Sequence, residues 1–440
     1  MNKINKRSYV PKILTSLGLA LFATQAFAAP QAVPGEFVVK MSASANVAMM
    51  SQLGASGVSV KEQISEQDGL YLARVSNPRA VLMKLQPSTG FQTMSIDRMS
   101  TEELQNSVQT ALQTLPGVDY VEPNYIYTAT VEAVSAPNDG SYGRQWALHN
   151  TFKAGADIHA HEAWATSKGS SKVIVAVVDT GIDYSHPDLG SNMWTKPGTS
   201  SVHGINAVTG VEDPMDDTSF AHGTHCSGII GAVGNNEIGI SGVNWNVGLM
   251  GAKFLTRNGS GSLAGAIKAI DYAVANGARV INASWGGGPY SQALYDSINR
   301  AGKAGILFVA AAGNDGTNND SRAVYPAGYQ LDNVVAVAAT DKRDQLADYS
   351  NFGVRNVLLA APGSGILSTV ATHGYGELDG TSMAAPHVSG AVALLLSVVQ
   401  NLSPSEIKQR LAAAVDVIPS LQGRVKSGGR LNVAKLLSAN

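Results

Sequence analysis

Cysteine is almost missing from this chain, because Cys226 is the one cysteine among 440 residues. An intrachain disulfide is therefore impossible, and a lipid-modified cysteine behind an N-terminal signal is excluded as well. If the protein works outside the cell, its stability must come from the size of its core or from bound ions.

Charged residues are also scarce, at 15% of the chain, and the two signs nearly cancel to a formal net charge of -2. A balance this close to neutral gives no electrostatic reason to expect nucleic acid or an anionic membrane as a partner. Apolar residues, by contrast, make up 44% of the chain, and glycine occurs 46 times. This composition favours a large core with many tight turns.

The N-terminus has the composition of an export signal. Basic residues precede an apolar run at 13–23, and Ala26-Phe27-Ala28 places small residues at both cleavage-site positions. The run is too short to span a bilayer comfortably, so a cleaved signal is favoured over a membrane anchor. No other segment is expected to span a membrane. We predict that residues 1–28 are a signal peptide and that the protein is secreted, to the extracellular medium or alternatively to the periplasm.

Two regions follow, separated by a linker at about 128–141. In the first region, at about 33–127, strands are predicted at 36–40, 70–75 and 118–121, and a helix at 101–115. A small α+β domain fits this order. The linker lacks amphipathic periodicity and contains Pro137-Asn138-Asp139-Gly140, which is typical of turns.

The second region contains short, continuous apolar runs, which suit strands buried on both faces. Helical segments at 262–276 and 292–304 lie between several of these runs, which are found at 173–178, 247–252, 279–283, 306–311 and 334–338. This alternation predicts an α/β fold with a doubly wound parallel sheet and helices on both faces. Functional sites in such folds form at the carboxyl ends of the strands.

Asp179 occupies such a position, directly after the run at 173–178, and Thr180-Gly181 follows it. Alone, Asp-Thr-Gly also resembles an aspartic peptidase motif. That chemistry needs two carboxylates that share one proton. The chain has no second Asp-Thr-Gly or Asp-Ser-Gly, so only a homodimer could supply the second carboxylate.

A second segment, His222-Gly223-Thr224-His225-Cys226, offers a general base, a metal ligand or a structural histidine. Zinc is disfavoured because no glutamate follows His222 and no further ligands occur at metal-binding spacing. The third segment, Gly380-Thr381-Ser382, leads into an apolar helix predicted at 388–399. Ser382 is then near a helix N-terminus, where backbone N–H groups favour negative charge, although serine is also a common helix cap.

In the order Asp, His, Ser, these three segments resemble the subtilisin-like serine peptidases (subtilases), and the resemblance covers about residues 142–436. It implies that Ser382 is the nucleophile, His222 the base and Asp179 the residue that orients the base. Ala311-Ala312-Gly313-Asn314 is similar to the oxyanion motif of the family. Asn314 and the backbone N–H of Ser382 would then stabilise the tetrahedral intermediate.

The resemblance also implies a substrate-binding edge. Ser284-Trp285-Gly286 is similar to the segment whose backbone pairs with an extended peptide in this family, which predicts broad specificity. Val324 is expected near the base of the pocket for the side chain before the scissile bond. A β-branched residue there would make the pocket shallower.

Residues 233–243 resemble the calcium loop of the family, with an ordinary polar loop as the alternative. The resemblance implies a structural calcium ion, and no catalytic cofactor. Its oxygen ligands would be Asp139, Asp188, the Asn236 side chain, and the carbonyls of Ile238 and Ile240.

The first region resembles the inhibitory propeptide of the family, a small ferredoxin-like α+β domain. The resemblance implies a propeptide at 29–136 that assists folding, inhibits the catalytic domain at 137–440 and is removed by self-cleavage between 127 and 137. Protein and peptide substrates and a monomeric state are expected. An inactive relative serving as a binding module would lack a catalytic residue, and none of the three is missing.

Overall fold

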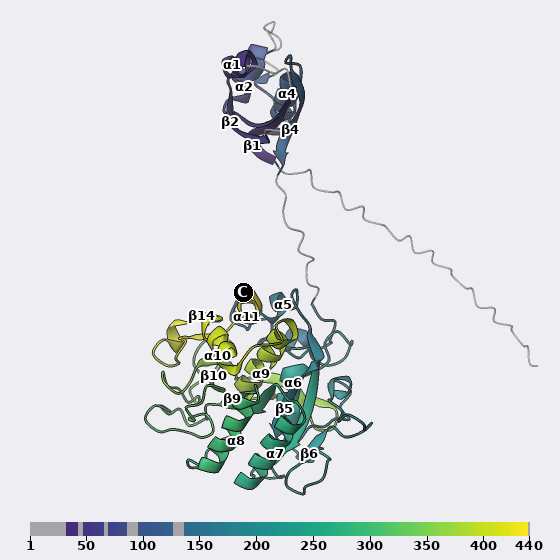
Figure 1. Cartoon of the computed structure of the whole chain (residues 1–440), viewed down its shortest axis with the longest axis vertical. Helices are drawn as coiled ribbons and strands as arrows, with labels where there is room; N and C mark the ends of the chain where they lie inside the picture. Colours follow the sequence, from purple (N-terminus) through teal and green to yellow (C-terminus); the bar gives the residue numbers. More distant parts are fainter. Residues whose placement is uncertain (1–31, 43–46, 66–68, 86–95, 126–135, 439–440) are drawn as a thin grey trace, which may run out of the picture. The chain divides into compact units, whose positions relative to one another are not determined.

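The computed structural model of the chain describes residues 32–42, 47–65, 69–85, 96–125 and 136–438 (Figure 1). The chain divides into two compact units, Met1–Val131 and Glu132–Asn440. The predicted signal peptide and residues 127–135 of the predicted cleavage segment lie outside the described residues.

The first unit is an antiparallel sheet with helices, its strands in the order β2-β3-β1-β4. Its described elements are β1 (Ala32–Met41), α1 (Val47–Ser56), β2 (Val58–Ser65), β3 (Leu70–Val75), α2 (Pro78–Leu85), α4 (Thr101–Gln113) and β4 (Val118–Tyr125). The helix α4 begins at a capping box, in which Ser100 and Glu103 each bond to the other's backbone N–H. Its buried Val108 and Leu112 help to form the core. Apart from the additional helix between β3 and β4, this succession is the β-α-β-β-α-β order of a ferredoxin-like α+β domain.

The second unit contains a nine-stranded sheet in the order β14-β15-β11-β10-β9-β8-β5-β7-β6. All its strand pairs are parallel except the antiparallel pair at the β14 edge. The strands are β5 (Gly169–Asp179), β6 (Gly204–Asn206), β7 (Asn246–Lys253), β8 (Val280–Ala283), β9 (Leu307–Ala311), β10 (Val334–Thr340), β11 (Leu359–Pro362), β14 (Val415–Val417) and β15 (Gly429–Leu431). A separate hairpin is formed by β12 (Ile366–Val370) and β13 (Gly374–Leu378).

Both faces of this sheet are buried, as β5 shows. Its side chains alternate: Val175 and Val177 lie in one core cluster, whereas Ala176 and Val178 lie in the other. The first cluster includes residues of α6 (His222–Gly231) and α9 (Thr381–Val398), and the second includes residues of α7 (Leu263–Ala275) and α8 (Gln292–Lys303). The remaining helices are α5 (Ala160–Ala163), α10 (Pro404–Ala413) and α11 (Val433–Ser438). The predicted doubly wound α/β sheet is confirmed.

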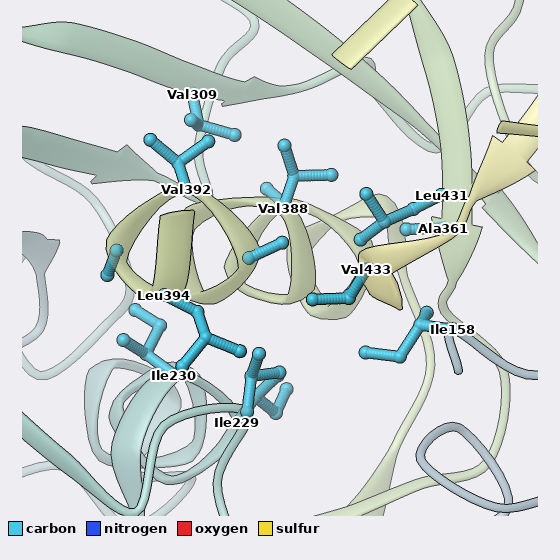
Figure 2. Close-up of a cluster of buried hydrophobic side chains, with 14 of the residues drawn as sticks. Ile158, Ile229, Ile230, Val309, Ala361, Val388, Val392, Leu394, Leu431 and Val433 are labelled. Carbon is cyan, nitrogen blue, oxygen red and sulfur yellow. The ribbon is translucent and has the colours of Figure 1, made fainter. Parts of the chain in front are cut away.

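The helix α9 lies at the centre of the first cluster. Figure 2 shows Val392 beside Val309 of β9, while Leu394 lies beside Ile229 and Ile230 of α6. Leu394 and Ile230 are fully buried. At roughly 25 cal/mol per Å² of buried apolar surface, such side chains stabilise the fold by about 1.5–3 kcal/mol each.

Two expectations about α9 are wrong. It begins at Thr381, well before residue 388, and Pro386 lies inside it. It is also long and apolar enough to cross a membrane by length and composition, contrary to the expectation for this part of the chain. Because 83% of that stretch is buried inside the unit, we interpret it as a core helix.

Candidate active site

The candidate catalytic residues lie at the carboxyl edge of the large sheet. Asp179 is the last residue of β5, and Ser284 directly follows β8. Asn314 comes three residues after the end of β9. Because β5, β8 and β9 are neighbouring parallel strands, their carboxyl ends meet at one edge. The chain topology thus brings these three residues to the same side of the sheet.

Asp179 and His222 form a hydrogen-bonded pair. His222 is the first residue of α6, and its Nδ1 lies 2.8 Å from Oδ1 of the fully buried Asp179. The N–H of Thr180 donates to the same Asp179 oxygen at 2.7 Å. Close packing at Gly223 is required here, since a Cβ on it would lie 2.2 Å from the Gly181 carbonyl oxygen. A glycine after His222 therefore lets α6 start directly against the end of β5.

The environment of His222 favours its protonated form. Burial lowers the pKa of the imidazole, but the charge of Asp179 and its hydrogen bond, with a further contribution from Asp216, raise the pKa above its ordinary value overall. An imidazole poised in this way accepts a proton readily and holds it beside the carboxylate. This is the behaviour required of a general base.

Ser382 is the second residue of α9, and Cys226 connects it to the histidine helix. Pro386 has no N–H to donate to the Ser382 carbonyl four residues earlier. That carbonyl accepts hydrogen bonds from Ser284 Oγ at 2.8 Å and from Cys226 Sγ at 3.5 Å. Cys226 lies one helical turn after His222, so the start of α9 contacts α6 one turn beyond the histidine.

The Ser382 hydroxyl donates to the Ser284 carbonyl oxygen at 3.0 Å. Within the described part of the chain it makes no hydrogen bond to His222. Rotation about the Cα–Cβ bond of Ser382 would redirect the hydroxyl. Catalytic hydrogen bonds are commonly long or poorly aligned without substrate and tighten when it binds.

Two hydrogen-bond donors converge beside Ser382. Asn314 Oδ1 accepts from both N and Oγ1 of Thr381, each at 2.9 Å, which turns the Nδ2 group of the amide away from Thr381. Gly380 has no side chain, and a Cβ built on it would lie 3.4 Å from Asn314 Nδ2 and 3.5 Å from Ser382 N. The missing side chain therefore leaves a small space beside these two nitrogens, both of which carry hydrogen. Such a space suits an oxyanion.

The predicted substrate edge and pocket residues lie next to this space. The indole N–H of Trp285 donates to the Val178 carbonyl oxygen at 2.8 Å, which fixes the segment to the end of β5. Val324 Cγ1 lies 3.3 Å from the Cβ position of Gly286 and 3.7 Å from that of Gly313. The Val324 side chain is thus in contact range of the substrate edge and of the residue before Asn314.

A groove of about 500 Å³ continues from Trp285 and Gly286, and the sequence analysis did not identify its other walls. They include Phe254, Leu255, Leu263, Ala266 and Leu294, together with the segment at 259–262. The signal that could have found them is the Gly259-Ser260-Gly261-Ser262 stretch, which follows β7 where a parallel strand reaches the active edge.

The zinc alternative fits this site poorly. Ligand atoms of Asp179, His222 and Cys226 lie within 4.8 Å of one another. However, these atoms already have protein partners: Nδ1 of His222 is hydrogen-bonded to Asp179 Oδ1 at 2.8 Å, and Cys226 Sγ donates to the Ser382 carbonyl oxygen at 3.5 Å. His225 is a structural residue, with its Nε2 3.0 Å from the Ile366 carbonyl oxygen and 3.1 Å from that of Gly376.

The predicted calcium residues gather around two buried carboxylates. Asp188 accepts hydrogen bonds from Asn236 Nδ2 at 2.8 Å and from the N–H of Ile240 at 2.9 Å. Asp139 accepts from the N–H of Asn235 at 2.7 Å. Ile238, whose carbonyl is the fifth predicted ligand, donates its N–H to Asn236 Oδ1 at 3.0 Å.

Burial raises the pKa of both Asp139 and Asp188, and the charge of Asp188 adds to the effect on Asp139. Within the described ranges no lysine or arginine forms an ion pair with either carboxylate. A divalent cation would supply the positive charge that this pair lacks, and carboxylate and carbonyl oxygens are the ligands that calcium prefers. The two buried carboxylates therefore suit a cation such as calcium, whereas Asn236 presents its Nδ2 to Asp188 and its Oδ1 to the N–H of Ile238.

Comparison with known proteins points in one direction. The sequence model of the subtilase family matches residues 170–431. The thermophilic serine proteinase of Bacillus sp. (strain AK1) is 37% identical over 376 residues, 85% of this chain and 85% of that protein. The halolysin-like extracellular serine protease Nep of Natrialba magadii is 33% identical over 362 residues, 82% of this chain and 63% of that protein. A solved protease from Pseudoalteromonas arctica PAMC 21717 has a TM-score of 0.59 at 30% identity, covering 69% of this chain and 99% of that one.

Proposed function

Since the chain belongs to the subtilase family and is a subtilisin-like serine peptidase, we propose that it is a secreted endopeptidase of broad specificity whose triad is Asp179, His222 and Ser382. The observation that carries the proposal is the arrangement at the sheet edge. His222 is hydrogen-bonded to Asp179, and Cys226, one helical turn after His222, contacts the Ser382 carbonyl beside the proposed oxyanion space.

In this mechanism, His222 takes the proton from the Ser382 hydroxyl as its oxygen attacks the scissile carbonyl carbon. The carbonyl oxygen becomes an oxyanion that accepts hydrogen bonds from Asn314 Nδ2 and Ser382 N. When the tetrahedral intermediate collapses, His222 gives its proton to the leaving amine, and an acyl group remains on Ser382. A water molecule, deprotonated by His222, then releases the acyl group. Asp179 stabilises the imidazolium in both steps.

Substrate recognition is expected to be mainly through the peptide backbone. The backbone of Ser284, Trp285 and Gly286 would pair with an extended substrate, which gives affinity without dependence on one side chain. The apolar groove beyond Trp285 would accept large apolar side chains further from the scissile bond.

A serine-directed phosphonylating reagent tests the proposed nucleophile. We expect inactivation with one reagent molecule per protein, and peptide mass mapping should place the adduct on Ser382. The reagent should not label a Ser382→Ala variant. Inhibition by pepstatin with no serine adduct would instead support the aspartic alternative, and metal-chelator inhibition without rescue by calcium would support the zinc alternative. A folded, unlabelled and inactive protein would support a binding module.

The pocket before the scissile bond provides a prediction about specificity. The Val324 side chain is proposed to fill part of the pocket between Gly286 and Gly313. A Val324→Gly variant should therefore cleave after Tyr, Phe or Leu with kcat/KM raised about tenfold, the magnitude expected when a pocket can bury a few more carbons of the substrate side chain. Cleavage after Ala should stay within about twofold of the unmodified protein. Exposed Val208 provides the matched control as Val208→Gly. Equal profiles for all three proteins would contradict the assigned position of Val324.

The first unit is proposed to be an inhibitory propeptide, removed by the enzyme itself after export. Its position directly ahead of the catalytic unit and its separate compact fold support this role. Export is supported by the signal-like residues 1–28 and by the extracellular relative. Protein substrates and the chain's own first unit are then the partners proposed for the active site.

Calcium is proposed as the cation that Asp139 and Asp188 hold, with Asn236, Ile238 and Ile240 as the further oxygen donors. Any ligand that binds the native state alone stabilises it, by about 2.7 kcal/mol at a hundredfold excess over its dissociation constant. We expect a chelator to lower the melting temperature, and added calcium to restore it. An Asp188→Asn variant should melt at the same temperature with or without calcium. A melting temperature of the unmodified protein that calcium does not change would contradict this site.

A further inference from the structure

A second buried carboxylate lies close to the catalytic pair, and none of the steps above uses it. Asp216, 6% exposed, belongs to the connection between β6 and α6. Its oxygens accept five hydrogen bonds: Oδ2 from Thr180 Oγ1 (2.9 Å), Thr224 N (3.2 Å) and Thr224 Oγ1 (2.9 Å), and Oδ1 from Thr218 N (3.2 Å) and Thr218 Oγ1 (2.6 Å). Among the described residues, no lysine or arginine forms an ion pair with this carboxylate.

Three of the five donors to Asp216 come from the two segments that carry Asp179 and His222. Thr180 directly follows Asp179 and donates its own N–H to Asp179 Oδ1. Thr180 Oγ1 also accepts the N–H of Gly223 at 2.9 Å, the residue after His222. Thr224 is the next residue of α6. The Asp216 carboxylate therefore joins the end of β5 to the first turn of the histidine helix through hydroxyl and backbone groups.

The turn at Thr180, directly after β5, is also held by a buried lysine. Lys253, 4% exposed, is the last residue of β7, and its Nζ donates to the Thr180 carbonyl oxygen at 2.6 Å. Its charge is paired with Asp217 at 2.8 Å, not with Asp216. The negative charge of Asp216 is thus stabilised by neutral donors and remains available to act on His222.

We propose that Asp216 is a positioning residue whose carboxylate sets the hydrogen bond between Asp179 and His222 and supports the protonated form of His222. The inference rests on the proposed serine-peptidase function. Two negative charges, those of Asp179 and Asp216, raise the pKa of His222 against the lowering effect of burial. The Lys253–Asp217 ion pair lies beyond Thr180. His225 is neutral, because burial lowers its pKa to about 3, and Cys226 is a thiol.

The test compares Asp216→Asn with Asp213→Asn, a matched control on the same connection, where exposed Asp213 accepts the Tyr184 hydroxyl. For Asp216→Asn we expect kcat to fall about 10- to 100-fold, the cost of a small misplacement of catalytic groups. KM should stay within about twofold. The acid limb of the kcat/KM profile should move to lower pH, because a negative charge that stabilises the imidazolium is lost. The control Asp213→Asn should match the unmodified protein in kcat, in KM and in the position of the acid limb.

A measurement that does not depend on activity separates the two proposals. In the full chain carrying Ser382→Ala, which removes self-processing as a variable, the proton between Asp179 and His222 should give a low-field NMR resonance that Asp216→Asn shifts or broadens. A lower melting temperature with an unchanged resonance, kcat and acid limb would overturn the positioning role. If the unmodified protein hydrolyses no peptide but the resonance responds, the positioning role stands and the proposed function fails. If Asp216→Asn does not accumulate, Thr180→Val removes one of the five donors and should give a smaller shift in the same direction.

Discussion

Replacing Ser382 with alanine is expected to abolish peptide hydrolysis while the fold is retained. The change removes the attacking oxygen and also the hydrogen bond to the Ser284 carbonyl, which water can replace at this partly exposed position. We expect a loss of about 10⁶-fold in kcat, because that is the magnitude known for the nucleophile of a subtilisin, which belongs to the same family. The measurement is steady-state hydrolysis of a peptide substrate, with circular dichroism to verify folding.

The same variant should also retain its first unit. If Ser382 performs the proposed self-cleavage, the secreted unmodified protein should have lost the first unit, and the intact mass of Ser382→Ala should include it. Ser171→Ala, an identical change at an exposed position of β5, is the control and should be processed normally. Equal trimming of all three proteins would assign processing to another peptidase. No trimming of any of them would contradict the proposed self-processing precursor.

Asp179→Asn is expected to lower kcat by about 10⁴-fold, the loss known for the corresponding change in a serine-protease triad. Asp179 Oδ1 accepts from both Thr180 N and His222 Nδ1. If the amide oxygen of asparagine takes the place of Oδ1, both hydrogen bonds remain, but the negative charge that stabilises the imidazolium is lost. If the NH₂ group takes that place, it donates to Nδ1 of the imidazole, which is then held in the tautomer that cannot accept the Ser382 proton. The arrangement of the side chains would be preserved, but His222 would no longer act efficiently as the base.

The direction of the accompanying pH change follows from the pKa of His222. In the unmodified protein this pKa is raised, because the charge and hydrogen bond of Asp179 outweigh the lowering effect of burial. Hydrolysis needs neutral His222, so activity should fall as the pH drops through that raised pKa. In Asp179→Asn burial remains and the charge is gone, so the acid limb should move to lower pH. An acid limb that does not move, or that moves to higher pH, would contradict the assignment of His222 as the base.

Much of the fold could be predicted because its strands are buried on both faces. The apolar runs at 173–178 and 334–338 lie within β5 and β10, since a strand covered by helices on both sides needs no polar alternation. The start of α9 could not be predicted in this way. Proline is normally tolerated only in the first turn of a helix, yet Pro386 lies further inside α9, where the Ser284 hydroxyl donates to the carbonyl that the proline leaves free.

Residues of the candidate site could be predicted where they belong to a short motif at the end of a strand or the start of a helix. Asp179 ends a strand, Asn314 follows one, and His222 and Ser382 lie in the first turn of a helix; parallel topology brings the ends of such strands to one edge. Asp216 could not be found, because its proposed role comes from the three hydrogen bonds that it accepts from Thr180 and Thr224, which belong to other segments of the chain. A carboxylate in a polar loop gives no sign in the sequence that it is buried.

The alternation of side chains along β5 limits where residues can be inserted or deleted during evolution. Val175 and Val177 face one core and Ala176 and Val178 the other, so deletion of one residue before them would exchange the two sets. It would also displace Asp179 from His222 by about 3.3 Å, the rise of one strand residue. Changes in chain length should therefore accumulate in the surface connections of related sequences, such as the stretch between β6 and α6 ahead of Asp216. The length of β5 should be among their most constant features.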